Sequence, residues 1–421
     1  MVASSLSTNG PVISKLSWLS NLAVFLLGAI SLVVPSGYSV GAVILFLAGV
    51  GLMVAQRSPQ LTAQDRWIIA SLLAYAAVNI AEAWWDAQGI RGIDSPIRFI
   101  FAIPALLWVM IYPPRLVFLW GGFGVGAILS GIWAGWQRVV ENVERAEGHT
   151  HVIQFGNLSM LLGVFCLAGL GWAMVQQHRK AWVGFLLVGA IAGILGSLLS
   201  GSRGGWVGFP IVLWVLYRAY GKNITIKLKG AILLLVLIGG SAIYMIPQIG
   251  VQDRIHQAAN DISSYFSGEH VLSSVGSRFE MWRGAGHMIL EKPITGWGEN
   301  GYRDQMEVLA SQGVVDQGIT HYSHAHNEFI DTFAKRGGIG LLVLMILYLV
   351  PLRLFMRSFA EPDLEKRSVA VAGALLPVAY IDFGLTQAFL THHSGTMMYA
   401  FLLAVLWGIH STHRRQSQPT T

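Results

Sequence analysis

The chain of 421 residues is 54% hydrophobic and only 12% charged, whereas charged residues make up roughly a quarter of an ordinary soluble protein. Its 28 Lys and Arg residues exceed its 22 Asp and Glu residues, giving a formal net charge of +6. The charged residues lie between long apolar segments, so the basic balance indicates membrane orientation and no nucleic-acid partner. This composition excludes a soluble globular protein and predicts a membrane protein.

Apolar segments long enough to cross about 30 Å of hydrocarbon recur along the chain. Two of them, 99–112 and 206–219, are short, which favours tilted or partly re-entrant helices. Most of the 48 glycines are scattered through such segments, where small residues allow close helix packing. We expect about twelve transmembrane helices, at 17–34, 38–56, 67–85, 99–112, 115–134, 153–175, 181–199, 206–219, 229–246, 339–355, 368–388 and 394–410.

Lys and Arg residues are concentrated in alternate connections, such as Arg57, Arg179 and Lys180. The positive-inside rule therefore places both termini in the cytoplasm and the loop before the tenth helix outside. Residues 1–246 are expected to hold transmembrane helices 1–9, and residues 247–338 to form a long outer loop with a histidine motif. Residues 339–421 are expected to hold helices 10–12 and a cytoplasmic tail. The predicted fold class is an all-α polytopic membrane protein.

The long outer loop contains patterns typical of short helices. Apolar residues recur at helical spacing over 251–266, and 276–290 is predicted to be a second helix. Residues 291–301 are rich in Gly and Pro, which favours a loop. Residues 325–336 are expected to be helical and to lead into the next span.

Two arginines beside glycines are candidates for binding an anion. Arg203, in Ser202-Arg203-Gly204-Gly205, precedes a predicted helix, where free backbone N–H groups favour phosphate. Arg278 follows Gly276-Ser277, and its planar guanidinium suits an oxyanion. The alternative for each is a structural role, as a topological anchor or in a salt bridge.

Three further arginines on the outer side are weaker candidates for the same substrate. Arg283 follows Arg278 on the same predicted helix, and Arg98 and Arg138 lie in or beside other outer connections. Each has a structural alternative, such as a solvated helix face or an ion pair.

The segment His321-Tyr-Ser-His324-Ala-His326 permits three interpretations. The three histidines are suitable zinc ligands, but their spacing fits no established metal site, and Cys166 is the only cysteine. They are alternatively a structural cluster at the start of the next helix. The preferred interpretation makes His326 a general base, because an unperturbed imidazole titrates near neutral pH.

The neighbours of His326 are supporting candidates. Asn327 is suited to holding a substrate hydroxyl or to orienting the loop, and Glu328 or Asp331 to orienting the imidazole. His324 and Ser202 are included among the supporting residues.

An ordered set of motifs resembles the O-antigen ligase and polymerase superfamily of bacterial envelopes over about residues 200–345. The motifs are Ser202-Arg203-Gly204-Gly205, Ser277-Arg278-x-x-x-Trp282, Pro293-x-x-Gly296-x-Gly298-x-x-Gly301, His324-x-His326-Asn327-x-x-Ile330 and Gly337-Gly338-Ile-Gly340-Leu-Leu. The long outer loop before the histidine motif resembles the ligase branch.

The resemblance implies a metal-independent glycosyltransferase without a cofactor, located in the bacterial inner membrane with its active site facing the periplasm. Its donor would be O-antigen linked to undecaprenyl diphosphate, and its acceptor lipid A-core. Arg203 and Arg278 would bind the diphosphate, and His326 would activate the acceptor. Direct attack on the anomeric carbon would invert its configuration.

Three alternatives remain open. An O-antigen polymerase or a protein O-oligosaccharyltransferase of the same superfamily would use the same donor half of the site. A lipid-linked glycan transporter would move the diphosphate without bond chemistry, but it predicts charge within the spans, which are nearly free of it. The sequence does not predict the oligomeric state.

Overall fold

A computed structural model describes residues 10–202, 204–245, 251–268 and 272–416. Arg203, one of the two main candidates for anion binding, lies outside these residues. The helices at the predicted spans are α1 (Gly10–Ala29), α2 (Gly37–Val54), α3 (Ala63–Trp85), α5 (Ile97–Ile111), α6 (Leu116–Val139), α7 (Val152–Ala173), α8 (Arg179–Ser200), α10 (Phe209–Tyr220), α11 (Ile226–Met245), α15 (Glu328–Met356), α16 (Leu364–Gly384) and α17 (His393–Gln416). The other elements are α4 (Gly89–Asp94), α9 (Gly204–Val207), α12 (Val251–Ser267), α13 (Gly276–Glu291), α14 (Glu299–Ser311) and the 3-10 turns η1 (Gly221–Asn223), η3 (Gln317–Ile319) and η4 (Phe389–Thr391).

The helices confirm an all-α polytopic membrane protein. In the described part of the chain, nine helical segments are long and apolar enough to cross a membrane, and Leu16–Ala29 and Phe209–Tyr220 are shorter apolar helices. With α11, a helix lies at each of the twelve predicted positions. The predicted span 206–219 is broken at Gly208 into α9 and α10, whereas the other short span, 99–112, forms the continuous helix α5.

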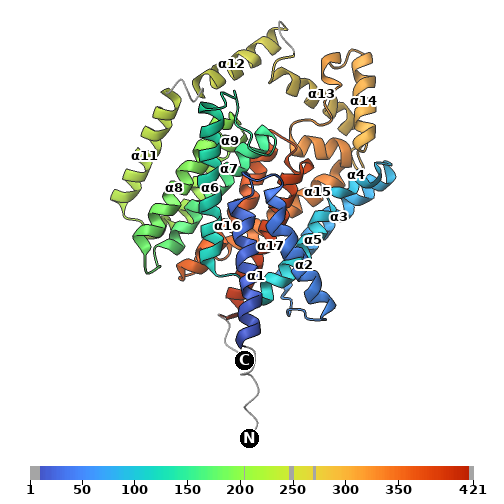
Figure 1. The fold of residues 1–421 in the computed structure, drawn as a ribbon. Coiled ribbons are helices and arrows are strands. Elements are labelled where there is room, and N and C mark those ends of the chain that lie inside the picture. Colours follow the sequence, from blue (N-terminus) through green and yellow to red (C-terminus); the bar gives the residue numbers. More distant parts are fainter. Residues whose placement is uncertain (1–9, 203, 246–250, 269–271, 417–421) are drawn as a thin grey trace.

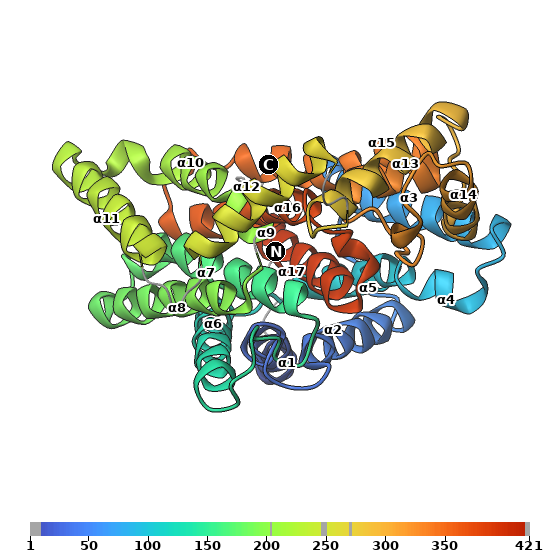
Figure 2. The ribbon, with the colours of Figure 1, turned by 90° about the horizontal axis from the view of Figure 1, so that it is seen from above.

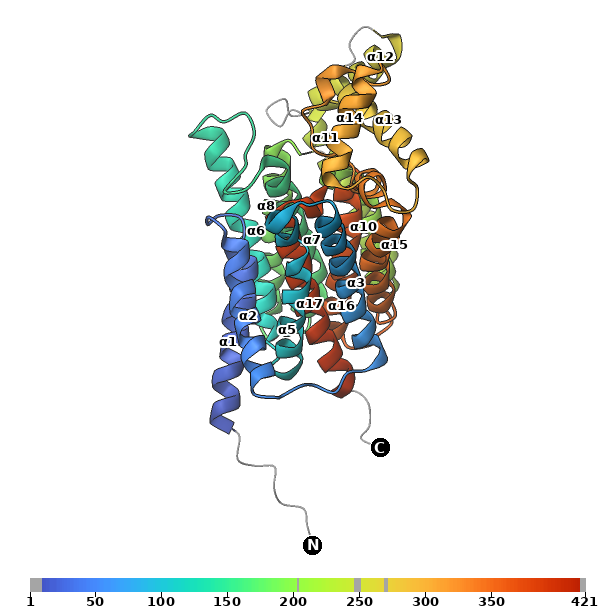
Figure 3. The same ribbon diagram turned by 90° about the vertical axis from the view of Figure 1, so that its right-hand side faces the viewer.

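The helices form an upright bundle with a separate outer region. Figures 1 and 3 show that α1 begins and α17 ends at one end of the bundle, while α12, α13 and α14 lie beyond the opposite end. Seen from above, α16 and α17 lie among the other helices (Figure 2). The spans in α7, α16 and α17 are the most completely buried of the nine. These helices therefore form the centre against which the others pack.

Glycines allow α1 and α6 to pack closely. A Cβ atom on Gly122 would lie 2.7 Å from the carbonyl oxygen of Phe25, and a Cβ atom on Gly126 would lie 2.2 Å from that of Gly28. Such contacts leave no room for a side chain, so these glycines serve helix packing in the membrane.

Helix α15 bends sharply at Gly337, where the backbone adopts φ 60° and ψ −163°. The bend frees carbonyl groups that would otherwise accept hydrogen bonds within the helix. The N–H of Trp297 donates to the carbonyl of Ala334 at 3.0 Å, and the N–H of Gly298 donates to that of Lys335 at 2.8 Å. The Gly/Pro loop thus fixes the direction of the outer part of α15, which begins directly after His326.

The outer region has a small apolar core of its own. Met281 and Met288 of α13 pack with Tyr302 and Met306 of α14 and with Ala334 of α15. This core holds α13 against the outer part of α15, which brings Arg278 and the histidine segment into the same region of the protein.

In the outer region, the structure confirms the helices predicted at 251–266 and 276–290, which are α12 and α13. It differs from the other two predictions for this region. Helix α14 begins at Glu299, within the stretch predicted to be a loop, because Gly298 with φ 80° supplies its N-cap. Helix α15 begins at Glu328 and not at 325, because Asn327 caps it.

Candidate active site

His326 lies in a short loop held against the start of α15. Its backbone has φ 48°, a left-handed conformation that few residues other than glycine adopt. The side-chain oxygen of Asn327 accepts hydrogen bonds from the N–H groups of Phe329 and Ile330 at 3.0 and 3.1 Å. Its amide group donates to the carbonyl of Leu385 at 3.1 Å. These bonds place Asn327 in a loop-orienting position and tie the loop to the end of α16.

Gln387, in the connection between α16 and α17, orients the imidazole of His326. Its carboxamide oxygen lies 2.5 Å from Nδ1 of His326, and its nitrogen lies 3.0 Å from Nε2 of His392. A carboxamide oxygen only accepts hydrogen bonds, so Nδ1 of His326 carries the proton and Nε2 keeps its lone pair. Gln387 is 1% exposed, and its position is therefore well defined. The partner of His326 is Gln387 rather than Glu328 or Asp331, the expected candidates.

The surroundings of His326 favour the neutral imidazole. Burial lowers the pKa of His326 to about 4, and the nearby His324, Arg278 and His392 act in the same direction. Burial and neighbouring histidines likewise lower the pKa of His392 to about 4. At neutral pH, His326 is consequently a neutral base whose Nε2 has no partner within the described ranges, the form that general-base chemistry requires.

Arg278 lies in the first turn of α13 and is half-buried. Its positive charge contributes to the lowered pKa of His326, so these two sequence candidates lie in the same site. The second arginine motif approaches the same region: Ser202 is buried and donates to the side chain of Asn157 at 3.0 Å. A Cβ atom on Gly204 would lie 2.4 Å from the hydroxyl of Thr386, the residue before Gln387.

The three secondary arginines make structural contacts. Arg98 pairs with Asp94 at 2.7 Å and donates to the carbonyl of His393 at 3.2 Å. Arg138 donates to the carbonyls of Val143 and Glu144 in the loop that follows α6. Arg283 pairs with Glu280 at 3.2 Å and donates to the carbonyl of Val314. Each of the three thus has a structural role, and a contact with substrate stays a prediction for each of them.

Buried ion pairs support the histidine loop from below. Lys335, 1% exposed, lies 2.8 Å from Glu299 and 3.1 Å from Asp331, and it donates to the carbonyl of Ser323 at 2.8 Å. Asp331 also accepts the N–H of Ala325 at 2.9 Å. Burial raises the pKa of Glu299, but the pairing with Lys335 outweighs it, so this pKa is lowered overall.

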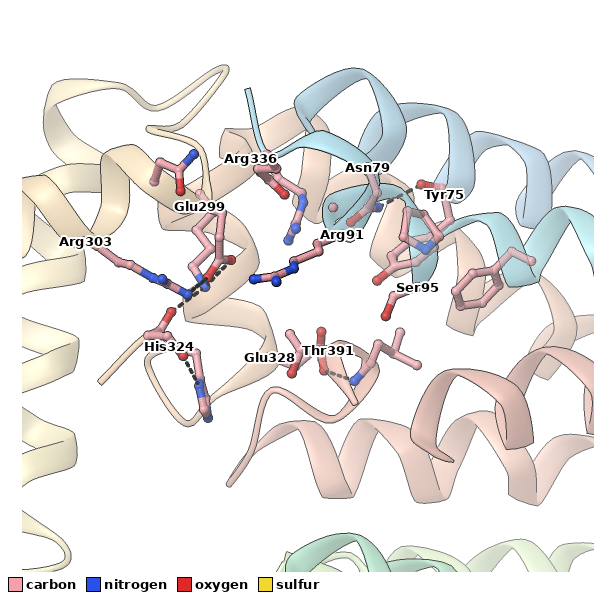
Figure 4. Close-up of a pocket in the computed structure, with 18 residues that line it drawn as sticks. Tyr75, Asn79, Arg91, Ser95, Glu299, Arg303, His324, Glu328, Arg336 and Thr391 are labelled. Carbon is pink, nitrogen blue, oxygen red and sulfur yellow. Dashed lines mark hydrogen bonds and ion pairs between the residues drawn. The ribbon is translucent and has the colours of Figure 1, made fainter. Parts of the chain in front are cut away.

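A cavity of about 440 Å³ opens beside the loop, between α3, α4, α14 and α15 (Figure 4). His324 forms part of its wall, and Nε2 of this histidine is buried without a hydrogen-bond partner among the residues that the structure describes. The carboxylate of Glu328, 3% exposed, also lines the cavity and accepts the N–H of Leu390 at 2.8 Å. Its charged lining consists of Arg91, Glu299, Arg303, Glu328, Lys335 and Arg336.

Among the described residues, no group of three or more His, Cys, Asp and Glu side chains is placed to hold a metal ion. The rings of His324 and His326 lie with centroids 4.3 Å apart, but the imidazole of His326 is bound to Gln387. The side chains in the described part of the chain are therefore not arranged as the zinc interpretation requires.

A family model described as O-antigen ligase matches residues 188–345. Residues 188–345 belong to the O-antigen ligase superfamily. The chain is 28% identical to an uncharacterized protein of Haemophilus influenzae over 386 residues, which is 91% of this chain and 96% of the relative. It is 26% identical to the O-antigen ligase of Escherichia coli K12 over 141 residues, 33% of each chain. The superfamily assignment indicates a glycosyltransferase-like enzyme in a multi-pass membrane protein.

The O-antigen ligase segment contains Ser202, Arg278 and His326, but not Gln387 or His392, which lie beyond it. Sequence analysis missed Gln387 as the partner of the imidazole. A signal was present, because Gln387 is a polar residue at the outer end of an apolar span and is followed closely by His392 and His393.

Proposed function

We propose that the protein is an O-antigen ligase that moves O-antigen polysaccharide from undecaprenyl diphosphate to a sugar hydroxyl of lipid A-core. The reaction would take place at the periplasmic face of the bacterial inner membrane. The observation that carries this proposal is the neutral imidazole of His326, which Gln387 orients and which lies near Arg278. His326 and Arg278 both belong to the segment that matches the O-antigen ligase model.

In the proposed reaction, Nε2 of His326 takes the proton of the acceptor hydroxyl. The acceptor oxygen forms a bond to the anomeric carbon of the donor sugar, and the bond between that carbon and the diphosphate oxygen breaks. The electron pair leaves on undecaprenyl diphosphate, where Arg278 and Arg203 would stabilise the growing negative charge. A single displacement of this kind inverts the anomeric configuration.

Transfer by purified protein in nanodiscs tests the proposal. The donor is undecaprenyl-diphosphate-linked O-antigen, the acceptors are lipid A-core and a second lipid-linked O-unit, and each reaction is run without and with EDTA. We expect conjugates with lipid A-core of inverted anomeric configuration. Elongation of the O-unit alone would indicate a polymerase. Absence of transfer in nanodiscs, together with donor movement across the bilayer of proteoliposomes, would indicate a transporter. Loss of transfer specifically on adding EDTA would revive the metal site.

The pH dependence of kcat/KM tests the environment of His326. In the wild type, we expect kcat/KM to fall on the acidic side only near pH 4, because the pKa of His326 in the enzyme without substrate is about 4. An unperturbed histidine would already be about 90% protonated at pH 5.5. In Gln387→Glu, a carboxylate would face Nδ1 and stabilise the imidazolium. The acidic fall in kcat/KM should therefore shift to a pH higher by about one unit or more, and kcat/KM at pH 5.5 should be lower than in the wild type.

The control for this prediction is Gln312→Glu, which adds the same charge at an exposed position after α14. Its pH profile should match that of the wild type. An unchanged acidic fall in kcat/KM in Gln387→Glu would exclude Gln387 as the residue that sets the protonation of the base.

A further inference from the structure

The cavity between α3, α4, α14 and α15 lies next to His326 and is distinct from the position of Arg278. Ser323 and His324 line it, whereas Arg278, Gln387 and His326 do not. The His324 ring, whose centroid is 4.3 Å from that of His326, separates the cavity from the base. A molecule in the cavity would thus lie beside His324, one ring away from the base, whereas Arg278 lies in the region of His326 outside the cavity lining.

Arg91 carries the cavity's unpaired charge. It comes from α4, and Figure 4 shows its guanidinium extending into the cavity. Within the described ranges it makes no hydrogen bond or ion pair, unlike Arg98 of the following helix. Arg91 therefore has donors to offer to a molecule from outside the chain.

Arg336 offers further donors from the opposite wall. Its Nε atom is bound to Glu82 at 2.9 Å, and its two terminal nitrogens have no partner among the described residues. The two guanidinium groups point into the same space in Figure 4. Paired guanidinium groups are well suited to the oxygens of a phosphate or carboxylate.

The carboxylates around the cavity already have partners. Glu299 pairs with Lys335 at 2.8 Å and Arg303 at 3.3 Å, and Glu82 pairs with Arg336. Glu328 accepts the N–H of Leu390. None of these carboxylates neutralises Arg91 within the described structure.

The rest of the lining suits a sugar. Ser95 and Ser323 supply hydroxyl groups, of which that of Ser323 also contacts Nδ1 of His324, and Asn300 supplies a side-chain oxygen while its nitrogen is bound to Asp86. The rings of Tyr75 and Phe99, both largely buried, pack at 4.7 Å on one wall. Clefts that combine a few oriented polar groups with aromatic surface are typical of small-molecule sites.

We propose that this cavity is the acceptor site, in which Arg91 and Arg336 bind the anionic group of an acidic or phosphorylated sugar. The inference rests on the proposed function and adds to it the chemical class of the acceptor. A sugar held there presents its hydroxyl past His324 to Nε2 of His326. The donor diphosphate binds separately, at Arg278.

Binding of labelled lipid A-core to the full-length protein in phosphatidylcholine nanodiscs, without donor, tests the assignment. We expect Arg91→Gln to weaken this binding by about tenfold or more, the loss of about 1.4 kcal/mol, and to raise the acceptor KM similarly. The donor KM and kcat should stay within about twofold, because the variant leaves the base and Arg278 untouched. Arg179→Gln, which removes the same charge at an exposed position at the start of α8 and outside the cavity lining, should bind like the wild type.

The outcomes separate the site from the reaction. A wild type that binds lipid A-core through Arg91 but transfers no glycan would refute the ligase and keep the site. The acceptor site would be overturned if Arg91→Gln were active with unchanged acceptor binding and acceptor KM. It would also be overturned if this variant raised the donor KM alone, or if the wild type did not bind lipid A-core. Dephosphorylated lipid A-core identifies the anion: an Arg91 effect that persists indicates a carboxylate, and one that disappears indicates a phosphate.

Discussion

Replacing His326 with asparagine is expected to lower kcat/KM for glycan transfer by about 10²–10⁴, the usual contribution of a general base. Asparagine tolerates the left-handed backbone that His326 adopts at φ 48° better than alanine does, but it cannot take a proton from the acceptor hydroxyl. The loss should therefore arise in the chemical step and not from unfolding. Initial rates at saturating donor, together with the melting temperature of each variant, measure it.

The matched control is His287→Asn, which makes the same substitution on the exposed face of α13. It should transfer glycan at the wild-type rate. Transfer by His326→Asn within about threefold of the wild type, in a protein of normal melting temperature, would remove the base assignment. It would leave the histidine segment with a purely structural role.

Hydropathy predicted the positions of the spans because the lipid hydrocarbon requires the residues of a transmembrane helix to be predominantly apolar. The apolar segments at 153–175, 368–388 and 394–410 became α7, α16 and α17 within a few residues. Shortness alone did not predict the break at Gly208, because the equally short span 99–112 forms the continuous helix α5. The outer region has no such single requirement, and α14 was missed because its Gly-rich start resembles a loop.

The partners within the site were not predictable from the sequence. Gln387 meets His326 across 61 residues, and Lys335 of α15 meets Glu299 at the start of α14. Adjacency favoured Glu328 as the partner of His326, whereas its carboxylate turns toward Leu390. Pairing between distant residues depends on how the helices pack, and a single sequence contains no direct measure of that packing.

Replacing Lys335 with methionine is expected to destabilise the protein by about 3–5 kcal/mol, the usual cost of removing one member of a buried ion pair. The ammonium group is 1% exposed and lies between Glu299 and Asp331. Methionine fills a similar volume but leaves the buried carboxylate of Asp331 without its cation, and it leaves Glu299, 24% exposed, with Arg303 alone. Reversible unfolding in mixed detergent micelles measures the change in free energy.

Arg303→Met separates the buried pair from an exposed one, because Arg303 contacts the same Glu299 at 3.3 Å with 53% of its side chain exposed. Exposed pairs contribute at most about 1 kcal/mol, so this variant should lie close to the wild type. Equal losses in the two variants would mean that the stability comes from Glu299 alone. A much larger loss of unfolding free energy in Lys335→Met would instead show that the stability comes from the contacts of Lys335. These contacts join α14 and α15 beneath the loop that carries His326.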